Sequence, residues 1–349
     1  MSSTSAATPT LERPAVQAPD AQLLFETVNA YQRTAALDAA IELDLFSAVA
    51  RGVQTAADLA KSCKASERGV RILCDYLTVI GFLTKENRRY SLTPTSAVFL
   101  DRGALSYAGT ITAFLNSPDL MGAFQNLSRA VRTGATAMEG AGVVDPEDNI
   151  WVSFANSMAP LMTGAAEFVG ELTAKLVPGP VKTLDIAAGH GLYGISVARH
   201  NPKAQVVALD WSNVLAVAQR NARRAGVGDR YHLLPGDAFK VDLRGPYDVV
   251  LLTNLLHHFD VPTCTTLLRK IHAALKPGGR LLTLEFVPNE DRVSPPVAAT
   301  FSLVMLALTP KGDAYTFAEL SQMLKEAGFA KNEIMEVPRM PQSLVVSAK

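Results

Sequence analysis

A short stretch of the chain places an acid directly before a glycine-rich turn. Residues 183–187 form an apolar run that contains Asp185 and is typical of a buried strand, and residues 193–200 are typical of a helix. Gly189 and Gly191 stand between them. Glycines at such a turn let a ligand approach the backbone closely, and the helix N-terminus offers unpaired N–H groups. The stretch therefore predicts a nucleotide-type pocket.

Two cofactors fit this pattern. Gly189, Gly191 and Gly194 match the dinucleotide spacing, and Asp210 follows at about the 20 residues expected of a ribose-binding acid, which favours NAD. Asp185 favours S-adenosylmethionine, because an acid that points toward the turn would repel a pyrophosphate, whereas this methyl donor carries a sulfonium and an ammonium. As a plainer alternative, Asp185 caps the turn, since Asp commonly accepts hydrogen bonds from turn N–H groups.

Further polar and aromatic residues follow the next two predicted strands, 205–210 and 231–235. Ligands of parallel sheets bind at the carboxyl ends of the strands. Asp210 can accept hydrogen bonds from both ribose hydroxyls of the cofactor, and the adjacent Trp211 can lie over the adenine. Asp237, which follows the second of these strands, can accept a hydrogen bond from the adenine amino group. The cofactor-binding prediction is therefore Asp185, Gly189, Gly191, Asp210, Trp211, Asp237, Ala238 and Phe239. Ordinary surface, packing and capping roles are the alternatives.

Two adjacent histidines, His257 and His258, follow the predicted strand 248–253. Histidine is the side chain best suited to general base catalysis near neutral pH. Glu285 stands inside the apolar run 281–287, and because a buried acid needs a partner we expect it to orient one of these rings. A metal site is not expected, because adjacent histidines point in different directions and no third ligand shares their spacing. A purely structural pair is the alternative.

Composition limits the classes of protein that this chain can represent. Its 349 residues are enough for two domains, 48% of them are hydrophobic, and the formal net charge is zero, so nothing favours nucleic acid or an anionic membrane. Three widely spaced cysteines show no metal pattern and are expected to be reduced thiols of a cytoplasmic protein. No apolar run reaches membrane-spanning length, and residues 1–19 are expected to form a disordered tail rather than a signal peptide.

Residues 20–110 have a winged-helix pattern. Helices are expected at 35–49, 55–61 and 66–80, with Thr55 and Ser66 as N-caps and Gly81 as the stop, followed by a hairpin over 82–92. Such a domain often binds DNA, but residues 1–110 contain 11 Lys and Arg against 11 Asp and Glu, without the basic excess of a DNA-reading module. We expect it to pack against a second subunit.

The rest of the chain changes from helices to alternating strands and helices. Long helices are expected at 105–133 and 150–175, with a mobile loop at 134–149 between them. Residues 177–180 read Val-Pro-Gly-Pro and form the clearest boundary. Beyond it, strands and helices alternate, which predicts a parallel sheet covered on both faces. The expected strands lie near 183–187, 205–210, 231–235, 248–253 and 280–286, then a helix at 317–327 and strands near 332–337 and 343–348.

Several motifs in this order together resemble one family, the small-molecule S-adenosylmethionine-dependent O-methyltransferases of plant phenolic and bacterial natural-product type. The resemblance is closest to bacterial members of unassigned substrate and covers residues 20–349. It is carried by the segments 40–46 (AIELDLF), 154–158 (FANSM), 184–191 (LDIAAGHG), 236–239 (GDAF), 256–259 (LHHF), 276–279 (KPGG) and 305–307 (MLA).

The resemblance implies an α/β fold, with a Rossmann-like class I methyltransferase sheet at 179–349 that binds S-adenosylmethionine. It also implies a winged-helix-like dimerisation domain at 20–110, a helical region at 111–178 that lines the substrate pocket, and a homodimer in which one subunit lines part of the other's pocket. The implied catalytic residues are His257 as base and Glu285 beside it. The implied acceptor-pocket residues are Phe154, Met158, His258, Phe301 and Met305, for which an ordinary helix core is the alternative.

The chain departs from the family pattern at two positions. His258 stands where the family usually has Asp, and Ala314 stands where plant members have a second acid beside the base. The leading hypothesis is O-methylation of a small, hydroxylated, aromatic acceptor with His257 as base. Because the second acid beside the base is missing, methylation of a sulfur, nitrogen or carbon atom is the second hypothesis. A non-catalytic, cofactor-bound dimer is the third, and an NAD-dependent dehydrogenase is a minor fourth.

Overall fold

The computed structural model describes residues 20–144 and 149–349. The expected tail at 1–19 and part of the expected loop, residues 145–148, lie outside these ranges. The chain forms two compact units that divide between Ala97 and Val98. The expected limits of the domains within these units stay a prediction.

The described part of the first unit consists of short helices and one hairpin. Its elements are α1 (Ala21–Val28), α2 (Ala30–Glu42), α3 (Leu45–Ala50), α4 (Ala56–Ser62), α5 (Glu67–Val79), β1 (Leu83–Glu86), β2 (Arg89–Leu92) and α6 (Pro94–Phe99), of which the last crosses the division. The hairpin pairs Leu83 with Leu92 in antiparallel register. The predicted hairpin is thus confirmed, and its sequence neighbours α3 to α5 supply the helices of the winged-helix pattern.

Local chemistry sets the ends of these helices. Thr55 and Ser66 accept hydrogen bonds from backbone N–H groups of the first turns of α4 and α5, and Gly81 follows α5 with a φ of +87°, as predicted. The helical pattern at 35–49, whose end was expected at 44–46, is two helices rather than one. It is divided into α2 and α3 at Asp44, which adopts the left-handed conformation with φ of +53°, a region that Asp tolerates better than most residues.

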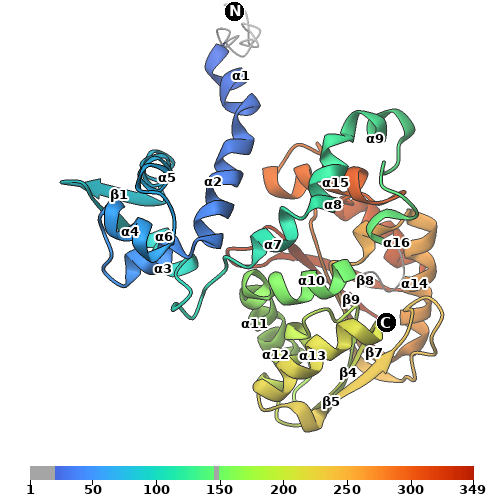
Figure 1. Ribbon diagram of the computed structural model, residues 1–349. Coiled ribbons are helices and arrows are strands. Elements are labelled where there is room, and N and C mark those ends of the chain that lie inside the picture. The colour runs from blue at the N-terminus through green and yellow to red at the C-terminus, as the bar shows by residue number, and fades with distance from the viewer. Residues whose placement is uncertain (1–19, 145–148) are drawn as a thin grey trace, which may run out of the picture. The chain divides into compact units, whose positions relative to one another are not determined.

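The second unit is built on a seven-stranded sheet, which Figure 1 shows in cross-section between its helices. The strands are β3 (Val181–Ile186), β4 (Ala204–Asp210), β5 (Tyr231–Pro235), β6 (Tyr247–Thr253), β7 (Leu275–Glu285), β8 (Lys331–Glu336) and β9 (Ser343–Ala348). They lie in the order β5-β4-β3-β6-β7-β9-β8. The first five are parallel, as predicted, and β9 runs antiparallel to both of its neighbours.

Both faces of this sheet are buried. In β6, Val249 and Leu251 belong to the apolar core beneath α11, α12 and α13, whereas Val250 and Leu252 belong to the core beneath α14 and α16. Alternate side chains of a strand point to opposite faces, so a continuous apolar run is what a strand covered on both faces requires. The order of the strands reverses between β3 and β6, and ligands of such sheets bind at that point, outside the carboxyl ends of the strands.

The helices and 3₁₀ turns of this unit include several breaks that the sequence pattern did not predict. The expected helix at 105–133 is three shorter ones, and the expected helix at 150–175 is interrupted at Met158. Prolines at the starts of α8 and α11 explain two of these breaks, because they lack the N–H that a continuing helix needs. The break between α8 and α9 falls at Asn126, without a proline. The elements are α7 (Ile111–Leu115), α8 (Pro118–Gln125), α9 (Leu127–Thr133), η1 (Gly142–Val144), α10 (Asn149–Ser157), α11 (Ala159–Leu176), α12 (Leu192–His200), α13 (Ser212–Arg224), η2 (Gly228–Arg230), η3 (Leu256–His258), α14 (Val261–Ala274), α15 (Pro296–Leu308) and α16 (Phe317–Glu326).

Residues 177–180, expected as a boundary, connect α11 to β3 inside the second unit. Within the described ranges, none of the helices combines the length and the apolar character needed to span a membrane.

Candidate active site

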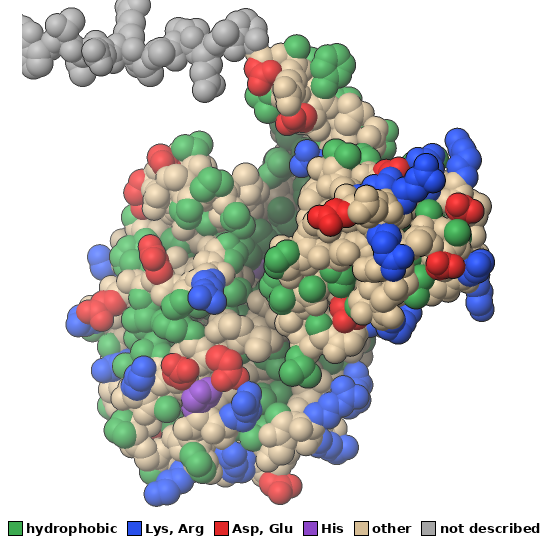
Figure 2. All heavy atoms as spheres, turned by 90° about the vertical axis from the view of Figure 1, so that its left-hand side faces the viewer, with side chains coloured by type: hydrophobic (Ala, Val, Ile, Leu, Met, Phe, Trp, Pro, Cys, Tyr) green, Lys and Arg blue, Asp and Glu red, His purple; other side chains and the backbone are tan. Residues whose placement is uncertain are grey.

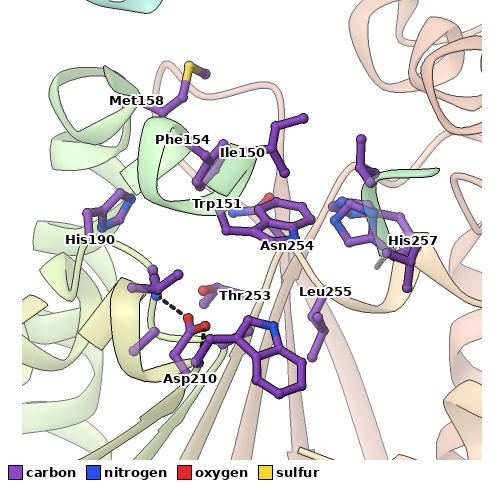
Figure 3. A pocket seen from close by; sticks show the side chains of 18 of the residues that line it. Ile150, Trp151, Phe154, Met158, His190, Asp210, Thr253, Asn254, Leu255 and His257 are labelled. Atoms are coloured by element: carbon purple, nitrogen blue, oxygen red, sulfur yellow. Dashed lines mark hydrogen bonds between the residues drawn. The ribbon is translucent and has the colours of Figure 1, made fainter. Parts of the chain in front are cut away.

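A cavity of about 330 Å³ opens at the carboxyl ends of the parallel strands. The segments after β3 to β7 form its floor and sides, and α10 and α15 contribute apolar side chains. Figure 3 shows Asp210 at the floor, with Trp151 and Phe154 above it and His190 and His257 on opposite sides. All the wall residues belong to the second unit.

The glycine turn and the end of β4 are bonded to each other. The backbone N–H of Gly189 donates to Oδ2 of Asp210 at 2.8 Å, and the N–H of Trp211 donates to Oδ1 of the same carboxylate at 2.7 Å (Figure 3). Burial raises the pKa of Asp210 to about 6, against the opposing effect of these two hydrogen bonds. Gly189, Asp210 and Trp211 all line the cavity. A carboxylate therefore faces the cavity at the position predicted for it.

Asp185 and Gly191 lie beneath the turn and are not among the residues that line the cavity. Oδ2 of Asp185 accepts from the backbone N–H of Gly194 at 3.0 Å, as the capping alternative proposed, and burial raises the pKa of this carboxyl to about 7. An added Cβ at Gly191 would lie 2.7 Å from the hydroxyl of Tyr231. These two residues therefore shape the turn, and any direct contact of theirs with a cofactor stays a prediction.

The loop after β5 contributes the next part of the wall. Asp237, Ala238 and Phe239 all line the cavity. Oδ1 of Asp237 accepts from the backbone N–H of Phe239 at 2.9 Å, and Oδ2 lies 3.2 Å from Nζ of Lys240. The Phe239 ring meets Phe259 edge to face, with centroids 4.8 Å apart. This side of the cavity thus combines two carboxylates with aromatic surface.

His257 and Glu285 form a buried pair on the opposite side. Nδ1 of His257 lies 2.5 Å from Oε2 of Glu285, and both side chains are about 95% buried or more. Oε1 of Glu285 accepts from the backbone N–H groups of Leu255 and Leu256, at 3.0 and 2.8 Å. Glu285 thus holds both the ring and the backbone of η3. With Nδ1 donating to the carboxylate, Nε2 of His257 keeps its lone pair.

His258 also lines the cavity and is 8% exposed. Its ring meets Trp151 edge to face at a centroid distance of 5.2 Å and lies 4.3 Å from the ring of His257. Burial, and secondarily the neighbouring His257, lowers the pKa of His258 well below its usual value. His258 is therefore a neutral imidazole at physiological pH, and both histidines reach the cavity.

The segment after α15 packs behind these histidines. Ala314 is fully buried and is not among the residues that line the cavity, so the departure from the plant pattern leaves Glu285 as the carboxylate that contacts His257. An added Cβ at Gly312 would lie 2.2 Å from the carbonyl oxygen of His257. Only glycine allows this close approach. The segment therefore supports the backbone of η3 and adds no second acid.

Apolar helices form the remaining wall. Phe301 on α15 stacks on Phe286, with centroids 3.9 Å apart, and meets the ring of His257 edge to face at 4.9 Å. Phe154 lines the cavity from α10 and Met305 lines it from α15. Met158 lines it from the junction between α10 and α11. The structure thus brings together all five predicted acceptor-pocket residues, Phe154, Met158, His258, Phe301 and Met305, around one cavity.

His190 and Trp151 are among the wall residues that the sequence did not predict. His190 was interpreted only as part of the glycine turn, but it lines the cavity, its ring stacks on Phe154, and burial lowers its pKa to about 4. Trp151 carries no signal in its local sequence, because only the packing of α10 over the sheet turns it toward the cavity. For His190, the signal in the sequence was its position between Gly189 and Gly191 in the predicted ligand-binding turn.

The cavity suits a cationic ligand at its Asp210 side. Among the described residues that line it, the acids are Asp210 and Asp237, and none is Lys or Arg. A pyrophosphate would find no positive side chain on these walls, whereas a sulfonium or ammonium group would meet carboxylates. The donor and acceptor groups present therefore fit S-adenosylmethionine better than NAD.

Comparisons with known proteins agree with this geometry. The family model of an O-methyltransferase domain matches residues 169–330, and that of an O-methyltransferase dimerisation domain matches residues 25–102. The 3-hydroxy-5-methyl-1-naphthoate 3-O-methyltransferase of Streptomyces sahachiroi is 30% identical over 315 residues, which cover 88% of each chain. The acetylserotonin O-methyltransferase of Mus musculus molossinus is 28% identical over 347 residues, covering 95% of this chain and 89% of that protein.

Solved structures give the same result. A candidate O-methyltransferase from Nostoc punctiforme superposes with a TM-score of 0.92 at 49% identity, covering 95% of this chain and 100% of the other. Human N-acetylserotonin methyltransferase, solved in complex with S-adenosylmethionine, matches in fold with a TM-score of 0.83 at 21% identity, covering 97% and 99% of the two chains.

The chain therefore belongs to the family of S-adenosylmethionine-dependent O-methyltransferases. The predicted fold is confirmed: a helical dimerisation domain precedes a class I methyltransferase sheet. The predicted methyl donor is confirmed as well, and the NAD alternative is not.

Proposed function

We propose that this methyltransferase methylates a hydroxyl oxygen on a small, neutral, aromatic molecule, with His257 as the general base. The observation that carries the proposal is the buried His257–Glu285 pair, which faces a cavity whose other side is glycine-rich and acidic. The cavity thus has a place for a cationic methyl donor on one side and a proton acceptor on the other.

The residues proposed to hold the donor surround the carboxyl ends of β3, β4 and β5. The backbone at Gly189 leaves room for a ligand, since an added Cβ there would have no neighbour closer than 3.9 Å. Asp210 offers remaining lone pairs to hydroxyl groups, and Asp237 offers them to an amino group. Trp211, Ala238 and Phe239 supply flat apolar surface. When bound, S-adenosylmethionine supplies an electrophilic methyl group on its sulfonium.

The proposed role of His257 follows from its hydrogen bond to Glu285. Because Nδ1–H donates to this carboxylate, Nε2 can take the proton of an acceptor hydroxyl while the oxygen receives the methyl group. The carboxylate stabilises the imidazolium that forms and fixes its orientation. Such general base catalysis is worth about 10²–10⁴-fold in rate.

The proposed class of acceptor follows from the rest of the wall. Aromatic and aliphatic side chains dominate it, including Phe114, Trp151, Phe154 and Phe301. Planar rings pack well among such side chains, edge to face or offset-stacked. No lysine or arginine among the described wall residues pairs with a carboxylate on the acceptor. The relative from Streptomyces sahachiroi, by its name, acts on a hydroxylated naphthoate, and a fused aromatic acceptor suits this cavity too.

The first unit is proposed to form a homodimer. Leu23, Leu24 and Phe25 on α1 are each more than 60% exposed, and so are Val28 and Tyr31. Figure 2 shows hydrophobic side chains on the helical surface next to the grey N-terminal residues. A second copy of this chain is the proposed occupant, because the matched family model is that of a dimerisation domain. Sedimentation should give a dimer, and Phe25→Asp should shift it to monomer; a monomeric parent protein would contradict the proposal.

The test of the reaction uses purified protein, S-adenosylmethionine and a panel of neutral naphthols and phenols. We expect S-adenosylhomocysteine and an O-methylated product in equal amounts. Matched thiols and anilines form the second half of the panel. Turnover of thiols or anilines without turnover of any hydroxyl compound would contradict the choice of oxygen as the acceptor atom.

A further inference from the structure

The segment between α15 and α16, residues 309–316, lies against η3 without reaching the cavity. None of these residues lines the cavity wall. At Gly312 the segment closely approaches the backbone of His257. At Tyr315 it contacts the residue after η3, because the Tyr315 hydroxyl donates to the carbonyl oxygen of Phe259 at 2.5 Å. A segment that contacts this backbone and no part of the cavity acts on the reaction only through the position of η3.

The two ends of η3 are held by different groups. At its N–H end, Oε1 of Glu285 accepts from two backbone N–H groups. At its carbonyl end, Tyr315 donates to the oxygen of Phe259, and the thiol of Cys264 on α14 donates to the oxygen of Leu256 at 3.2 Å. A single 3₁₀ turn has poor internal hydrogen-bond geometry, so groups outside it decide where it lies. Because a thiol is a weak donor, the hydroxyl of Tyr315 is the main support of the carbonyl end.

Tyr315 is itself fixed in place. It is 6% exposed and packs in the apolar core beneath α14 and α16. The next residue, Thr316, forms a capping box with Glu319 at the start of α16, and the N–H of Gly312 donates to Oγ1 of Thr309 at 2.8 Å. Burial raises the pKa of the Tyr315 hydroxyl, which therefore stays protonated and remains a donor. The segment is thus a rigid support for η3.

This support lies at the place where the chain departs from the plant pattern. With Ala314 in place of the second acid, Glu285 is the carboxylate that contacts His257. The orientation of the ring then depends more strongly on the backbone that carries it. Tyr315, the residue after Ala314, supplies a fixed contact to that backbone, which the methyl group of an alanine cannot do.

We propose that Tyr315 is a positioning residue for methyl transfer, whose hydroxyl holds the carbonyl end of η3 so that His257 stays aligned with Glu285 and with the acceptor hydroxyl. The proposal rests on the proposed function, since His257 must be the base whose position matters. Tyr315 does not line the cavity and so contacts neither donor nor acceptor. Loss of its hydroxyl should therefore slow the chemical step and leave the binding of both molecules unchanged.

The first experiment compares two variants that each remove one buried tyrosine hydroxyl. Tyr315→Phe keeps the ring in the core and removes only the hydrogen bond to Phe259. The matched control is Tyr247→Phe, because the hydroxyl of the fully buried Tyr247 also donates to a backbone carbonyl, that of Leu243, at 2.5 Å. Tyr247 stands at the start of β6, whereas η3 follows the other end of that strand. Both variants should lower the melting temperature by similar amounts.

The measured quantities are kcat and KM with 2-naphthol and the affinity for S-adenosylhomocysteine. We expect kcat of Tyr315→Phe to fall about tenfold, since a catalytic group displaced by about 1 Å can lose about 10²-fold in rate and this shift should be smaller. KM and the affinity should change by about twofold or less. Tyr247→Phe should keep the kcat of the parent protein.

A double variant tests whether the effect passes through His257. Tyr315→Phe is combined with His257→Ala, and the residual turnover is measured as S-adenosylhomocysteine released over long incubations. Once the ring is absent, its position no longer matters. The second substitution should therefore lower the residual kcat by about twofold or less, instead of about tenfold.

Several results would overturn the role of Tyr315. One is an unchanged kcat in folded Tyr315→Phe, or an equal fall in Tyr247→Phe. Another is a rise in KM or a loss of S-adenosylhomocysteine affinity that accounts for the lost activity, because Tyr315 would then shape a binding site. A third is a tenfold fall that persists in the His257→Ala background, because Tyr315 would then act independently of His257.

A second variant covers the case in which Tyr315→Phe does not fold. Cys264→Ala removes the weaker donor to the carbonyl end of η3, and kcat should fall by about threefold with KM unchanged. No fall beyond that of Tyr247→Phe would overturn the support of η3 from this end. The proposed function fails separately, if the parent protein methylates no hydroxyl compound or if His257→Ala alone keeps full turnover, and the role of Tyr315 then fails with it.

Discussion

The Asp210 side and the His257 side of the cavity are assembled differently. On the Asp210 side, short motifs that directly follow β3, β4 and β5 supply the glycine turn and both carboxylates, and backbone N–H groups fix these carboxylates. On the His257 side, Glu285 comes from β7, Phe301 from α15 and Trp151 from α10. The first side is polar and local in sequence, and the second is mostly apolar and assembled over long sequence distances.

This contrast indicates which side recognises a constant molecule and which a variable one. A site made from strand ends and backbone groups is rigid and tolerates few substitutions, which suits one methyl donor. A wall of helix side chains can change its shape by single substitutions without moving the sheet, which suits different acceptors. Substitutions on the two sides should therefore separate cleanly into effects on donor affinity and effects on acceptor turnover.

The largest effect is expected from Glu285→Gln on the His257 side. The Gln oxygen can still accept from the N–H groups of Leu255 and Leu256, which turns the amide NH₂ toward Nδ1 of His257. His257 must then carry its proton on Nε2 and cannot act as a base. We expect kcat to fall by about 10²–10⁴-fold with S-adenosylhomocysteine affinity unchanged. Steady-state kinetics measure kcat and calorimetry measures the affinity. A parallel loss of affinity would contradict the separation of donor binding from acceptor turnover.

Asp210→Asn should give the next largest effect, on donor affinity. Burial raises the pKa of Asp210 to about 6, and a ligand whose hydroxyls donate to this carboxylate favours its ionised form. S-adenosylhomocysteine affinity of the parent protein should thus rise as pH increases through about 6 and level off above it. The variant should bind about tenfold more weakly at pH 7.5, without that rise. Calorimetry from pH 5 to 8 measures it, and a parent affinity independent of pH would contradict the role of Asp210.

Gly312→Ala should affect the His257 side through the backbone. An added Cβ would lie 2.2 Å from the carbonyl oxygen of His257, so η3 must shift. Overpacking of this kind costs about 1–3 kcal/mol of unfolding free energy. We expect that loss in denaturant unfolding, together with a reduced kcat. The matched control is Gly122→Ala, where an added Cβ has no neighbour within 4 Å; equal losses in the two variants would speak against the close approach.

The smallest effect on affinity is expected from Asp185→Asn, which sharpens the contrast within the donor side. Asp185 lies beneath the turn, and the Asn oxygen can replace the carboxylate as acceptor of the Gly194 N–H. We expect donor affinity to change by about twofold or less, far less than for Asp210→Asn. A tenfold loss would show instead that Asp185 contacts the donor directly.

The same variant should change the dependence of stability on pH. Burial raises the pKa of Asp185 to about 7 in the folded protein, above the ordinary value of 3.8. Between these two values the folded state binds more protons than the unfolded state, so unfolding free energy falls as pH rises from about 4 to 7. Asp185→Asn should flatten that decline, and denaturant unfolding at pH 5 and 7.5 measures the difference.

Local sequence motifs predicted the residues of the Asp210 side, whereas Phe154, Met158, Phe301 and Met305 were predicted only from the family resemblance. The strands, the turn and Asp210 follow from continuous apolar runs that end in Gly and Asp, and such patterns depend on few distant contacts. The pairing of Glu285 with a histidine followed from the cost of burying an acid alone. The position of Trp151 in the cavity wall and the close approach of Gly312 to His257 depend on how helices and loops pack over the sheet. No local sequence pattern encodes that packing. Prolines and Asp44 explain three of the helix breaks, at the starts of α8, α11 and α3, which periodicity alone does not predict.

The most direct test of the account is the turnover of His257→Ala with S-adenosylmethionine and 2-naphthol, measured together with S-adenosylhomocysteine affinity. The account predicts a fall in kcat of about 10²–10⁴-fold with the affinity unchanged, because His257 removes the acceptor proton and does not hold the donor. Full turnover by the folded variant would contradict it.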